Sequence, residues 1–429
     1  MSLTQKIEDR SAKVVVVGQG YVGLPLAVRT SEVGFAVVGF ELDEEKSGSL
    51  ASGVSYVEDV SDRRLRDALA RGYEPTSDFR SLTNFDIAVI SVPTPLVEGR
   101  PDLSFIENAG RMLATHLRPG ACVVLESTTY PGTTEELLAP ILEKGSGLTR
   151  PEYFLGYSPE RVDPGNKEFP FEATPKVVSG DRTESLTIIK QFFELLVSSV
   201  VPVATCAEAE LTKLLENTFR HVNIALVNEL ALYASDLNIN IWRVIDAAAT
   251  KPFGFMRFEP GPGVGGHCLP IDPTYLAWRV REHLGHSFRF VELANDVNDH
   301  MPEYVVGRLM RLLNDQSRSV KGSRILLLGL AYKAGTGDWR ESPSAEIANQ
   351  LMSLGALVSI CDPHVDASRS GSYAPLLVPF TREAVRKSDV VVLLVGHPEF
   401  DPELIASTAP LVFDTRNVLR GFDFHGDRL

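Results

Sequence analysis

The stretch KVVVVGQGYVG, residues 13–23, decides the fold of the first part of the chain. Four successive valines before a glycine are typical of a strand that is buried on both faces of a parallel sheet. The glycines that follow have GxGxxG spacing, which allows a tight turn, a close approach of the backbone to a pyrophosphate and close packing of a helix, expected over residues 20–33. The stretch therefore predicts a turn that binds the pyrophosphate of a dinucleotide, formed by Gly18, Gln19, Gly20, Tyr21, Val22 and Gly23.

An acidic residue after the next expected strand indicates which dinucleotide is bound. Residues 36–40 are apolar and predict a second strand, and Glu41 follows it directly. A carboxylate at this place accepts hydrogen bonds from the adenosine ribose diol and repels a 2′-phosphate, so it favours NAD over NADP. The alternative is a glycine-rich turn that holds no ligand.

Strands and helices alternate in two parts of the chain, before residue 205 and after residue 319. Such alternation predicts a doubly wound parallel sheet in each part. The further elements that we expect are strands at residues 87–92, 121–125, 324–328, 357–361 and 390–395, and a helix at residues 343–354.

The middle of the chain has a different pattern. Residues 207–236 contain neither glycine nor proline, and leucines and a valine recur at helical spacing, which predicts a long helix with a broad apolar face. Such a face suits a partner subunit, so we expect a homodimer. A second helical span is expected over residues 290–316. The predicted fold class is α/β, with two Rossmann-like doubly wound domains joined by a long central helix, and with domains at residues 1–205, 206–318 and 319–429.

Composition restricts the class of protein. The chain has 42 basic and 56 acidic residues, and a net charge of -14 argues against binding to nucleic acid or to an anionic membrane surface. The purest apolar run, residues 390–395, is too short to cross a bilayer, and the polar residues 1–13 do not resemble a signal peptide. The four cysteines lack CxxC spacing, which indicates no metal site, no disulfide framework and a reducing, cytoplasmic compartment.

One cysteine stands in a setting that suits chemistry. Cys122 and Cys361 lie in apolar strands, where a cysteine is usually part of the core, but Cys268 follows the glycines of GVGGHC in a segment rich in glycine and proline. Glycines let backbone N–H groups and a ligand come close, which is typical of a nucleophile. A loop cysteine without chemistry is the alternative. The neighbouring His267 is not assigned as its base, because adjacent side chains in a loop usually point apart.

Other polar residues are candidates on weaker grounds. Lys213 and Asn217 are four residues apart and so share one face of the long helix, although a solvated face explains that spacing equally well. Glu160 follows a strand region, and a carboxylate at the carboxyl end of a sheet is a reasonable general base. The second α/β part lacks the three-glycine turn, so we expect a nucleotide diphosphate there, with Lys333 and Arg416 supplying charge unless they are ordinary surface cations.

Taken together, these motifs resemble the UDP-glucose/GDP-mannose dehydrogenase family along nearly the whole chain. Within that family, SPERVDPGNKEF, TKPFGFM and PGPGVGGHCLPIDP are most similar to UDP-N-acetylglucosamine 6-dehydrogenases. The eight motifs that carry the resemblance appear in order: GQGYVG (18–23), SVPTP (91–95), ESTTYPGTTEE (126–136), SPERVDPG (158–165), AEAELTKLLEN (207–217), GVGGHCLPIDP (263–273), LGLAYKAGTGDWRESP (328–343) and FDTRN (413–417).

The resemblance implies a role for each matching position. Cys268 matches the thiol nucleophile, and Lys213 and Asn217 match the pair that stabilises a developing alkoxide and orients a water. Asp272 matches a carboxylate that assists Lys213, and Glu160 the base of thioester hydrolysis. Further cofactor contacts are implied for Pro93, Thr94, Thr128 and Arg340, with the Thr128 hydroxyl also near the hydrolytic water. Substrate contacts are implied for Arg161, Lys213, Asn217, Arg257, Gly265, Lys333 and Arg416.

The implied reaction is a four-electron oxidation of carbon 6 of a UDP-sugar to the uronate, with two NAD and a cysteine thiohemiacetal and thioester. Pro164 stands where the glucose branch of the family carries a second glutamate, four residues after Glu160, and this favours UDP-N-acetylglucosamine. UDP-glucose or dTDP-glucose is the alternative substrate. A protein that binds nucleotide sugars without catalysis would lose the catalytic set, and a two-electron hydroxy-acid dehydrogenase would not need Cys268.

Overall fold

The structure is a computed structural model that describes residues 1–97, 99–162, 168–266 and 269–429. Pro164, His267 and Cys268 therefore lie outside the described residues. The chain divides into two compact units: residues 1–216 with 274–285, and residues 217–273 with 286–429. Each unit contains one large parallel sheet, which confirms the predicted fold class.

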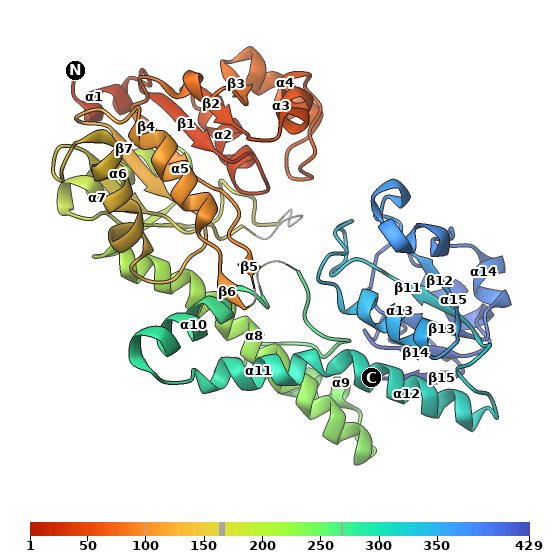
Figure 1. Ribbon diagram of the computed structural model, residues 1–429. Coiled ribbons are helices and arrows are strands. Elements are labelled where there is room, and N and C mark those ends of the chain that lie inside the picture. The colour runs from red at the N-terminus through yellow and green to blue at the C-terminus, as the bar shows by residue number, and fades with distance from the viewer. Residues whose placement is uncertain (98, 163–167, 267–268) are drawn as a thin grey trace. The chain divides into compact units, whose positions relative to one another are not determined.

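The sheet of the first unit has six strands in the order β3-β2-β1-β4-β7-β8 (Figure 1). All neighbours pair in parallel, and the strand order reverses between β1 and β4. Open α/β sheets bind their ligands at such a reversal, beside the carboxyl ends of the strands. The strands are β1 (Lys13–Val17), β2 (Ala36–Phe40), β3 (Tyr73–Thr76), β4 (Ile87–Ile90), β7 (Cys122–Leu125) and β8 (Phe154–Tyr157).

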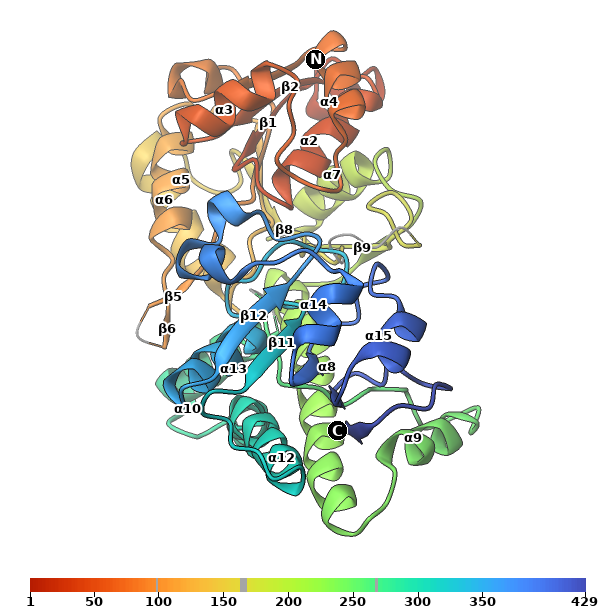
Figure 2. The same cartoon turned by 90° about the vertical axis from the view of Figure 1, so that its right-hand side faces the viewer.

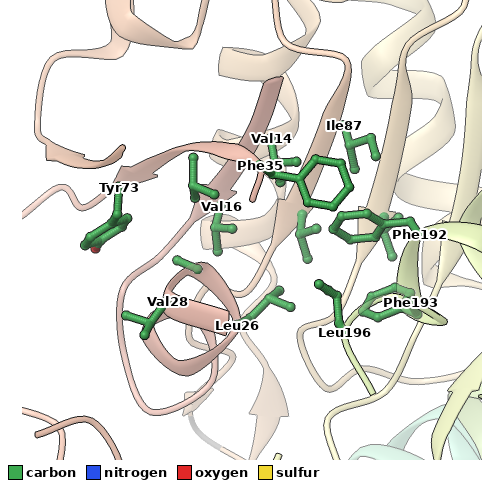
Figure 3. Packing of buried hydrophobic residues seen from close by; sticks show 14 of the residues in the cluster. Val14, Val16, Leu26, Val28, Phe35, Tyr73, Ile87, Phe192, Phe193 and Leu196 are labelled. Carbon is green, nitrogen blue, oxygen red and sulfur yellow. The ribbon is translucent and has the colours of Figure 1, made fainter. Parts of the chain in front are cut away.

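The first core forms because every second residue of β1 points to the same side. Val14 and Val16 are fully buried and belong to the same apolar cluster as Leu26 and Phe192 (Figure 3). The rings of Phe35 and Phe192 meet edge to face, with centroids 5.7 Å apart. The helices of this unit are α1 (Leu3–Glu8), α2 (Gly23–Glu32), α3 (Glu44–Ala51), α4 (Asp62–Ala70), α5 (Ser104–Ala114), α6 (Ala139–Ser146), α7 (Thr183–Phe193) and most of α10 (Asp272–Leu284).

Two small pairings accompany this sheet. The parallel pair β9 (Lys176–Val178) and β10 (Val200–Pro202) carries Lys176, which matters for the site below. The antiparallel pair β5 (Leu96–Val97) and β6 (Arg100–Pro101) follows β4.

The sheet of the second unit has five parallel strands in the order β12-β11-β13-β14-β15, all labelled in Figure 1. Figure 2 shows its strands β12 and β11 side by side. Alternate residues of β11 pack on opposite faces: Ile325 and Leu327 join one apolar cluster, and Leu326 and Leu328 join another. The sheet is therefore covered on both sides, as its uninterrupted apolar strands predicted. The elements are β11 (Arg324–Leu328), β12 (Leu357–Cys361), β13 (Val390–Leu393), β14 (Val412–Asp414), β15 (Gly426–Arg428), α13 (Pro343–Ser353), α14 (Arg382–Lys387) and α15 (Pro402–Thr408).

Helix α8 (Cys206–Asp236) is the predicted long helix, 31 residues in length. Its start is fixed by a capping box: the N–H of Glu208 donates to Thr205 Oγ1, and the Glu208 carboxylate accepts from the N–H of Thr205, both at 3.1 Å. Residues up to 216 belong to the first unit and later residues to the second. Helix α9 (Ile241–Ala249) follows it.

The prediction of a single helix over residues 290–316 was wrong in one respect. The structure has two helices there, α11 (Arg289–Asp299) and α12 (Met301–Asp315), which meet at His300. Pro302 lies in the first turn of α12. Proline has no N–H to donate to the preceding turn and its ring obstructs that turn, so the first helix ends and a second begins.

No helix in the part of the chain that the structure describes is both long enough and apolar enough to pass through a bilayer.

Candidate active site

The turn between β1 and α2 has the backbone that its three glycines predict. Gly18 has a φ of +92°, and a side chain there would lie 2.6 Å from the carbonyl oxygen of Ser91. A Cβ on Gly23 would lie 1.9 Å from the carbonyl oxygen of Gly18. A Cβ on Gly20, by contrast, would meet nothing within 4 Å, so packing inside the protein does not require this glycine. The arrangement fits a pyrophosphate bound against the backbone at Gly20.

Glu41 is held beside this turn. Its carboxylate accepts hydrogen bonds from the N–H of Gln19 at 3.1 Å and from the N–H of Asp43 at 3.2 Å. The side chain of Gln19 is buried, and its amide oxygen accepts a hydrogen bond from the Tyr73 hydroxyl at 2.7 Å. Glu41 is therefore fixed at the carboxyl end of β2, where a dinucleotide ribose binds in folds of this kind, whereas the side chain of Gln19 serves the interior.

The segments after β4 and β7 meet at the same edge of the sheet. The Ser91 hydroxyl donates to the carbonyl oxygen of Gly18 at 3.0 Å, and the Ser127 hydroxyl donates to that of Val92 at 2.8 Å. The Tyr275 hydroxyl of α10 donates to the carbonyl oxygen of Thr94 at 2.5 Å. These bonds hold in place the segments that carry the expected cofactor residues Pro93, Thr94 and the half-buried Thr128.

A buried cluster of charge lies at the carboxyl ends of β7 and β8. Glu126 follows β7, Glu160 follows β8, and the Lys176 ammonium from β9 forms ion pairs with both carboxylates. We call these three residues the buried triad. Of these three residues, only Glu160 was a candidate from the sequence, because Lys176 lies 50 residues from Glu126 and the fold brings them together.

The two carboxylates of the buried triad have different proton affinities. Burial raises the pKa of Glu126 to about 7, against the opposing effect of Lys176. Burial also acts to raise the pKa of Glu160, but the Lys176 ammonium, a hydrogen bond from the N–H of Val162 and the charge of Lys213 lower it below its usual value. Glu160 is therefore the ionised member, with its Oε1 accepting from the N–H groups of Arg161 at 2.7 Å and Val162 at 2.5 Å.

Lys213 and Asn217, the two residues expected to act together on the long helix, have different contacts. Lys213 is buried in the first unit, where its charge acts on Glu160. Asn217, one turn later, is buried in the second unit, and its amide nitrogen donates to a carboxylate oxygen of Asp272 at 2.5 Å. The structure thus brings Lys213 toward Glu160, whereas it brings Asn217 together with Asp272. Cys268, the expected nucleophile, lies outside the described residues.

The glycines before Cys268 are required by close packing within the second unit. A Cβ on Gly265 would lie 2.4 Å from the carbonyl oxygen of Glu341, and a Cβ on Gly266 would lie 2.8 Å from the ring of Tyr332. At the start of the segment, the N–H of Gly261 donates to the side-chain oxygen of Asn228 at 2.9 Å. The sequence suggested that these glycines make room for a ligand; for Gly265 and Gly266 the neighbouring backbone and ring already require them.

The basic residues expected at the substrate have different surroundings. Lys333 and Arg416 follow β11 and β14, at the carboxyl edge of the second sheet, and Arg416 Nε donates to the carbonyl oxygen of Leu394 at 3.1 Å. Arg257 is exposed and forms ion pairs with Asp246 and Glu259, both at 2.8 Å. Arg161 pairs with Glu216 at 2.6 Å.

Arg340, expected at the cofactor, is exposed in the second unit and pairs with Asp338 at 2.8 Å. Its contact with a cofactor, like the contacts of Arg161 and Arg257 with a substrate, stays a prediction.

One group in the second unit has the composition of a metal site. His364, His397 and Glu399 present ligand atoms that all lie within 4.8 Å of one another. His397 uses both ring nitrogens inside the protein, because Nδ1 accepts from the N–H of Gly335 at 3.3 Å and Nε2 lies 3.1 Å from a carboxylate oxygen of Asp362. A ring in this state has no lone pair to offer a metal ion, so we assign none to this group.

Comparison with known proteins identifies domains along the chain. Three domains described for the UDP-glucose/GDP-mannose dehydrogenase family match it: the NAD binding domain at residues 12–197, the central domain at residues 207–300 and the UDP binding domain at residues 326–421. These matches confirm the family resemblance inferred from the motifs, and the NAD cofactor with it.

Individual relatives are similar over nearly their whole length. A UDP-N-acetyl-D-glucosamine 6-dehydrogenase of Pseudomonas aeruginosa is 35% identical, over 91% of this chain and 92% of the relative. A UDP-N-acetyl-D-mannosamine dehydrogenase of Pyrococcus horikoshii is 34% identical, over 96% and 98%. A solved structure of a UDP-D-ManNAc dehydrogenase from Pyrococcus horikoshii superimposes with a TM-score of 0.87 at 32% identity, covering 96% of this chain and 98% of that one.

Proposed function

The chain belongs to the UDP-glucose/GDP-mannose dehydrogenase family, and from this premise we propose that it oxidises carbon 6 of a UDP-N-acetylhexosamine to the carboxylate. It is an NAD-dependent oxidoreductase that acts on a UDP-sugar. The observation that carries the proposed chemistry is Glu160, a buried carboxylate held ionised beside Lys213 at the edge of the NAD-binding sheet. A base of this kind is needed to hydrolyse a thioester, whereas an oxidation that stops at the aldehyde has no use for it.

The reaction that we propose has two oxidations at one carbon. Bound NAD supplies the acceptor for one hydride in each oxidation. Between them, the Cys268 thiolate adds to the aldehyde carbon and forms a thiohemiacetal, which converts a poor hydride donor into a tetrahedral one and keeps the intermediate on the enzyme. The second hydride loss leaves a thioester on Cys268, and water releases the uronate.

The side chains of this chain stabilise charge and move protons in that sequence. In our proposal, Lys213 stabilises the oxyanion that forms at carbon 6, and loss of one such donor typically costs a factor of about 100 to 1,000 in rate. Asn217, held by Asp272, orients the reacting oxygen. Glu160 takes the proton of the water that attacks the thioester.

The N-acetylated sugar is proposed from the loop after Glu160 and from the relatives. Pro164 replaces the carboxylate that glucose-specific members present, and the relatives quoted above act on N-acetylated UDP-sugars by name. A site that lacks a carboxylate partner for a free 2-hydroxyl should disfavour glucose, because an unpaired polar group costs about 1–3 kcal/mol. The test is kcat/KM for UDP-N-acetylglucosamine, UDP-N-acetylgalactosamine and UDP-glucose under one condition. A clear preference for UDP-glucose would contradict the substrate assignment and leave the dehydrogenase assignment intact.

The four-electron reaction has a direct test. Complete conversion of a limiting UDP-sugar should yield two NADH per sugar and a uronate, and a ratio of one would contradict the thioester mechanism. Cys268→Ala should bind NAD and UDP-sugar but form no uronate, which separates an enzyme from a protein that only binds nucleotide sugars. Normal uronate formation by Cys268→Ala would show that the nucleophile assignment is wrong.

We also propose that the enzyme is a homodimer that pairs through α8. Apolar residues along this helix are exposed and follow one another at intervals of four, four and three residues, counting the half-buried Val222. An eleven-residue repeat of this kind keeps an apolar stripe on one side of a nearly straight helix, where it can meet a second copy. The stripe consists of Leu211, Leu215, Phe219, Val222, Leu226, Leu230, Tyr233 and, one residue after the helix, Leu237.

We place the enzyme in the cytoplasm. Cys122, Cys206 and Cys361 are buried free thiols, which suits a reducing compartment. Fractionation of cells that express the chain, with uronate formation as the assay, tests this placement, and activity confined to a membrane or extracellular fraction would refute it.

A further inference from the structure

The buried triad contains a lysine to which the proposed chemistry gives no role. The side chains of Glu126, Glu160 and Lys176 are 0%, 10% and 4% exposed, so all three ionisable groups are nearly removed from water. Burying an ion is costly unless partners compensate for the lost water, and a buried lysine usually gives up its proton instead. Lys176 keeps its proton, because the two carboxylates raise its pKa against the effect of burial.

The Lys176 ammonium is surrounded by two aromatic rings and two carboxyl groups. Its Nζ lies 5.5 Å from the ring centroids of both Phe171 and Phe193, so aromatic faces flank the charge. It lies 3.0 Å from Glu160 Oε2 and also contacts Glu126 Oε1. Glu160 Oε1 is occupied by two backbone N–H groups, and within the described part of the chain Lys176 is the side chain that binds the other oxygen of the base.

The net charge of the buried triad explains why it takes up a proton. Two carboxylates and one ammonium carry one excess negative charge, and a buried site relieves it by holding a proton. Glu126 is the member with the raised pKa, about 7, and its Oε2 is buried without a hydrogen-bond partner among the residues that the structure describes. Glu160 faces Lys176 from β9, Glu126 from the end of β7 and Lys213 from α8, while the Arg161 guanidinium is turned to Glu216.

We propose that Lys176 is the positioning residue that keeps Glu160 ionised and oriented for thioester hydrolysis, with Glu126 holding the proton that the triad takes up. This inference rests on the proposed role of Glu160. In the step concerned, the water oxygen bonds to the thioester carbonyl carbon and the water proton passes to Glu160. The carbon–sulfur bond then breaks, and its electron pair leaves with the Cys268 thiolate. Lys176 touches neither the substrate nor the water in this scheme and acts through Glu160 alone.

The test measures hydrolysis separately from the oxidations. The enzyme is mixed with NAD and UDP-N-acetylglucosamine, and NADH, uronate and the mass of the intact protein are followed in quenched samples from pH 5 to pH 9. In Lys176→Met, NADH should form in a burst while the acyl-enzyme accumulates, and uronate release at pH 7 should fall about tenfold or more. The acid limb of the hydrolysis rate should move up by about one pH unit or more, because the base has lost the cation that held it ionised.

Two further variants distinguish the charge of Lys176 from a merely structural role. Lys176→Arg keeps the cation and should restore most of the rate and the position of the acid limb. Glu126→Gln removes the second carboxyl group that contacts Lys176 but resembles the protonated Glu126, so the acid limb should not move up. A matched control is Lys190→Met, which removes a lysine from an exposed pair with Glu194 at 3.5 Å and should change neither quantity.

The outcomes distinguish a failure of the role of Lys176 from a failure of the proposed role of Glu160. If Glu160→Gln hydrolyses the acyl-enzyme normally, the proposed role of Glu160 fails. If Glu160→Gln stalls as an acyl-enzyme and Lys176→Met does not, the role of Lys176 is refuted while that of Glu160 stands. An equal upward shift in Glu126→Gln, or slow hydrolysis in Lys176→Met with an unmoved acid limb, also overturns the inference. If Lys176→Met does not bind NAD and so has not folded, Lys176→Arg and Glu126→Gln still decide the question.

Discussion

Replacing Asn228 by alanine should loosen the segment that leads to Cys268. Asn228 is fully buried on α8, where its oxygen accepts from the N–H of Gly261 and its amide donates to Asn298 Oδ1, both at 2.9 Å. Alanine would leave one donor and one acceptor unpaired, and each buried unpaired group costs about 1–3 kcal/mol. We therefore expect the free energy of unfolding to fall by about 2–4 kcal/mol. Uronate formation should slow by about 10- to 100-fold, because a displacement near 1 Å can cost that much.

Urea unfolding gives the change in stability, and a single turnover followed by NADH absorbance gives the change in rate. The affinity for NAD should be unchanged, because the turn at residues 18–23 belongs to the other unit. Asn223→Ala is the control: this residue lies on the same helix, but its amide donates to the carbonyl oxygen of Phe219, at 2.7 Å, near the surface. The reasoning fails if Asn228→Ala is no less stable and no slower than Asn223→Ala.

Three other changes test separate parts of the structure. Gly23→Ala should abolish NAD binding measured by calorimetry, since the new Cβ would lie 1.9 Å from the carbonyl oxygen of Gly18; near-normal affinity would mean that the turn can rearrange. Glu41→Ala should weaken NAD binding and narrow the preference over NADP in kcat/KM, whereas equal use of NADP by the unchanged enzyme would refute the role of Glu41. Leu226→Asp places a charge in the apolar stripe of α8 and should yield monomers in sedimentation at micromolar concentration, where the unchanged enzyme should sediment as a dimer.

Elements whose signal is local were predictable from the sequence. The valine run of β1 and the uninterrupted periodicity of α8 each lie within one stretch of chain, and the structure has both elements within a residue or two of the expected bounds. The break at His300 was missed because the apolar pattern continues across it. Pro302 was the available signal, since a proline in the first turn marks the start of a helix.

The site was less predictable, because its contacts join residues that are far apart in the chain. Glu160 could be proposed from its place after a strand, but its partners come from β7 and β9, and no spacing in the sequence links Lys176 to Glu126. The glycines at 265 and 266 were attributed to ligand approach, which stays a prediction; the structure adds that the backbone of Glu341 and the ring of Tyr332 also require them. A sequence motif indicates that a position requires glycine, but it does not show which neighbouring group leaves no room for a side chain.

Helix α8 limits how the chain can be divided. The boundary between the two units falls after residue 216, inside a continuous helix, and the proposed catalytic residues Lys213 and Asn217 lie one turn apart on either side of it. A protein whose domains are joined by a loop can exchange one domain for another, because the cut falls in a segment without chemistry. Here the same cut would break a helical turn between two residues to which we assign catalytic roles. Exchanging a whole unit with a relative would cut α8. Cofactor preference and sugar preference should therefore be altered by substitutions within each unit.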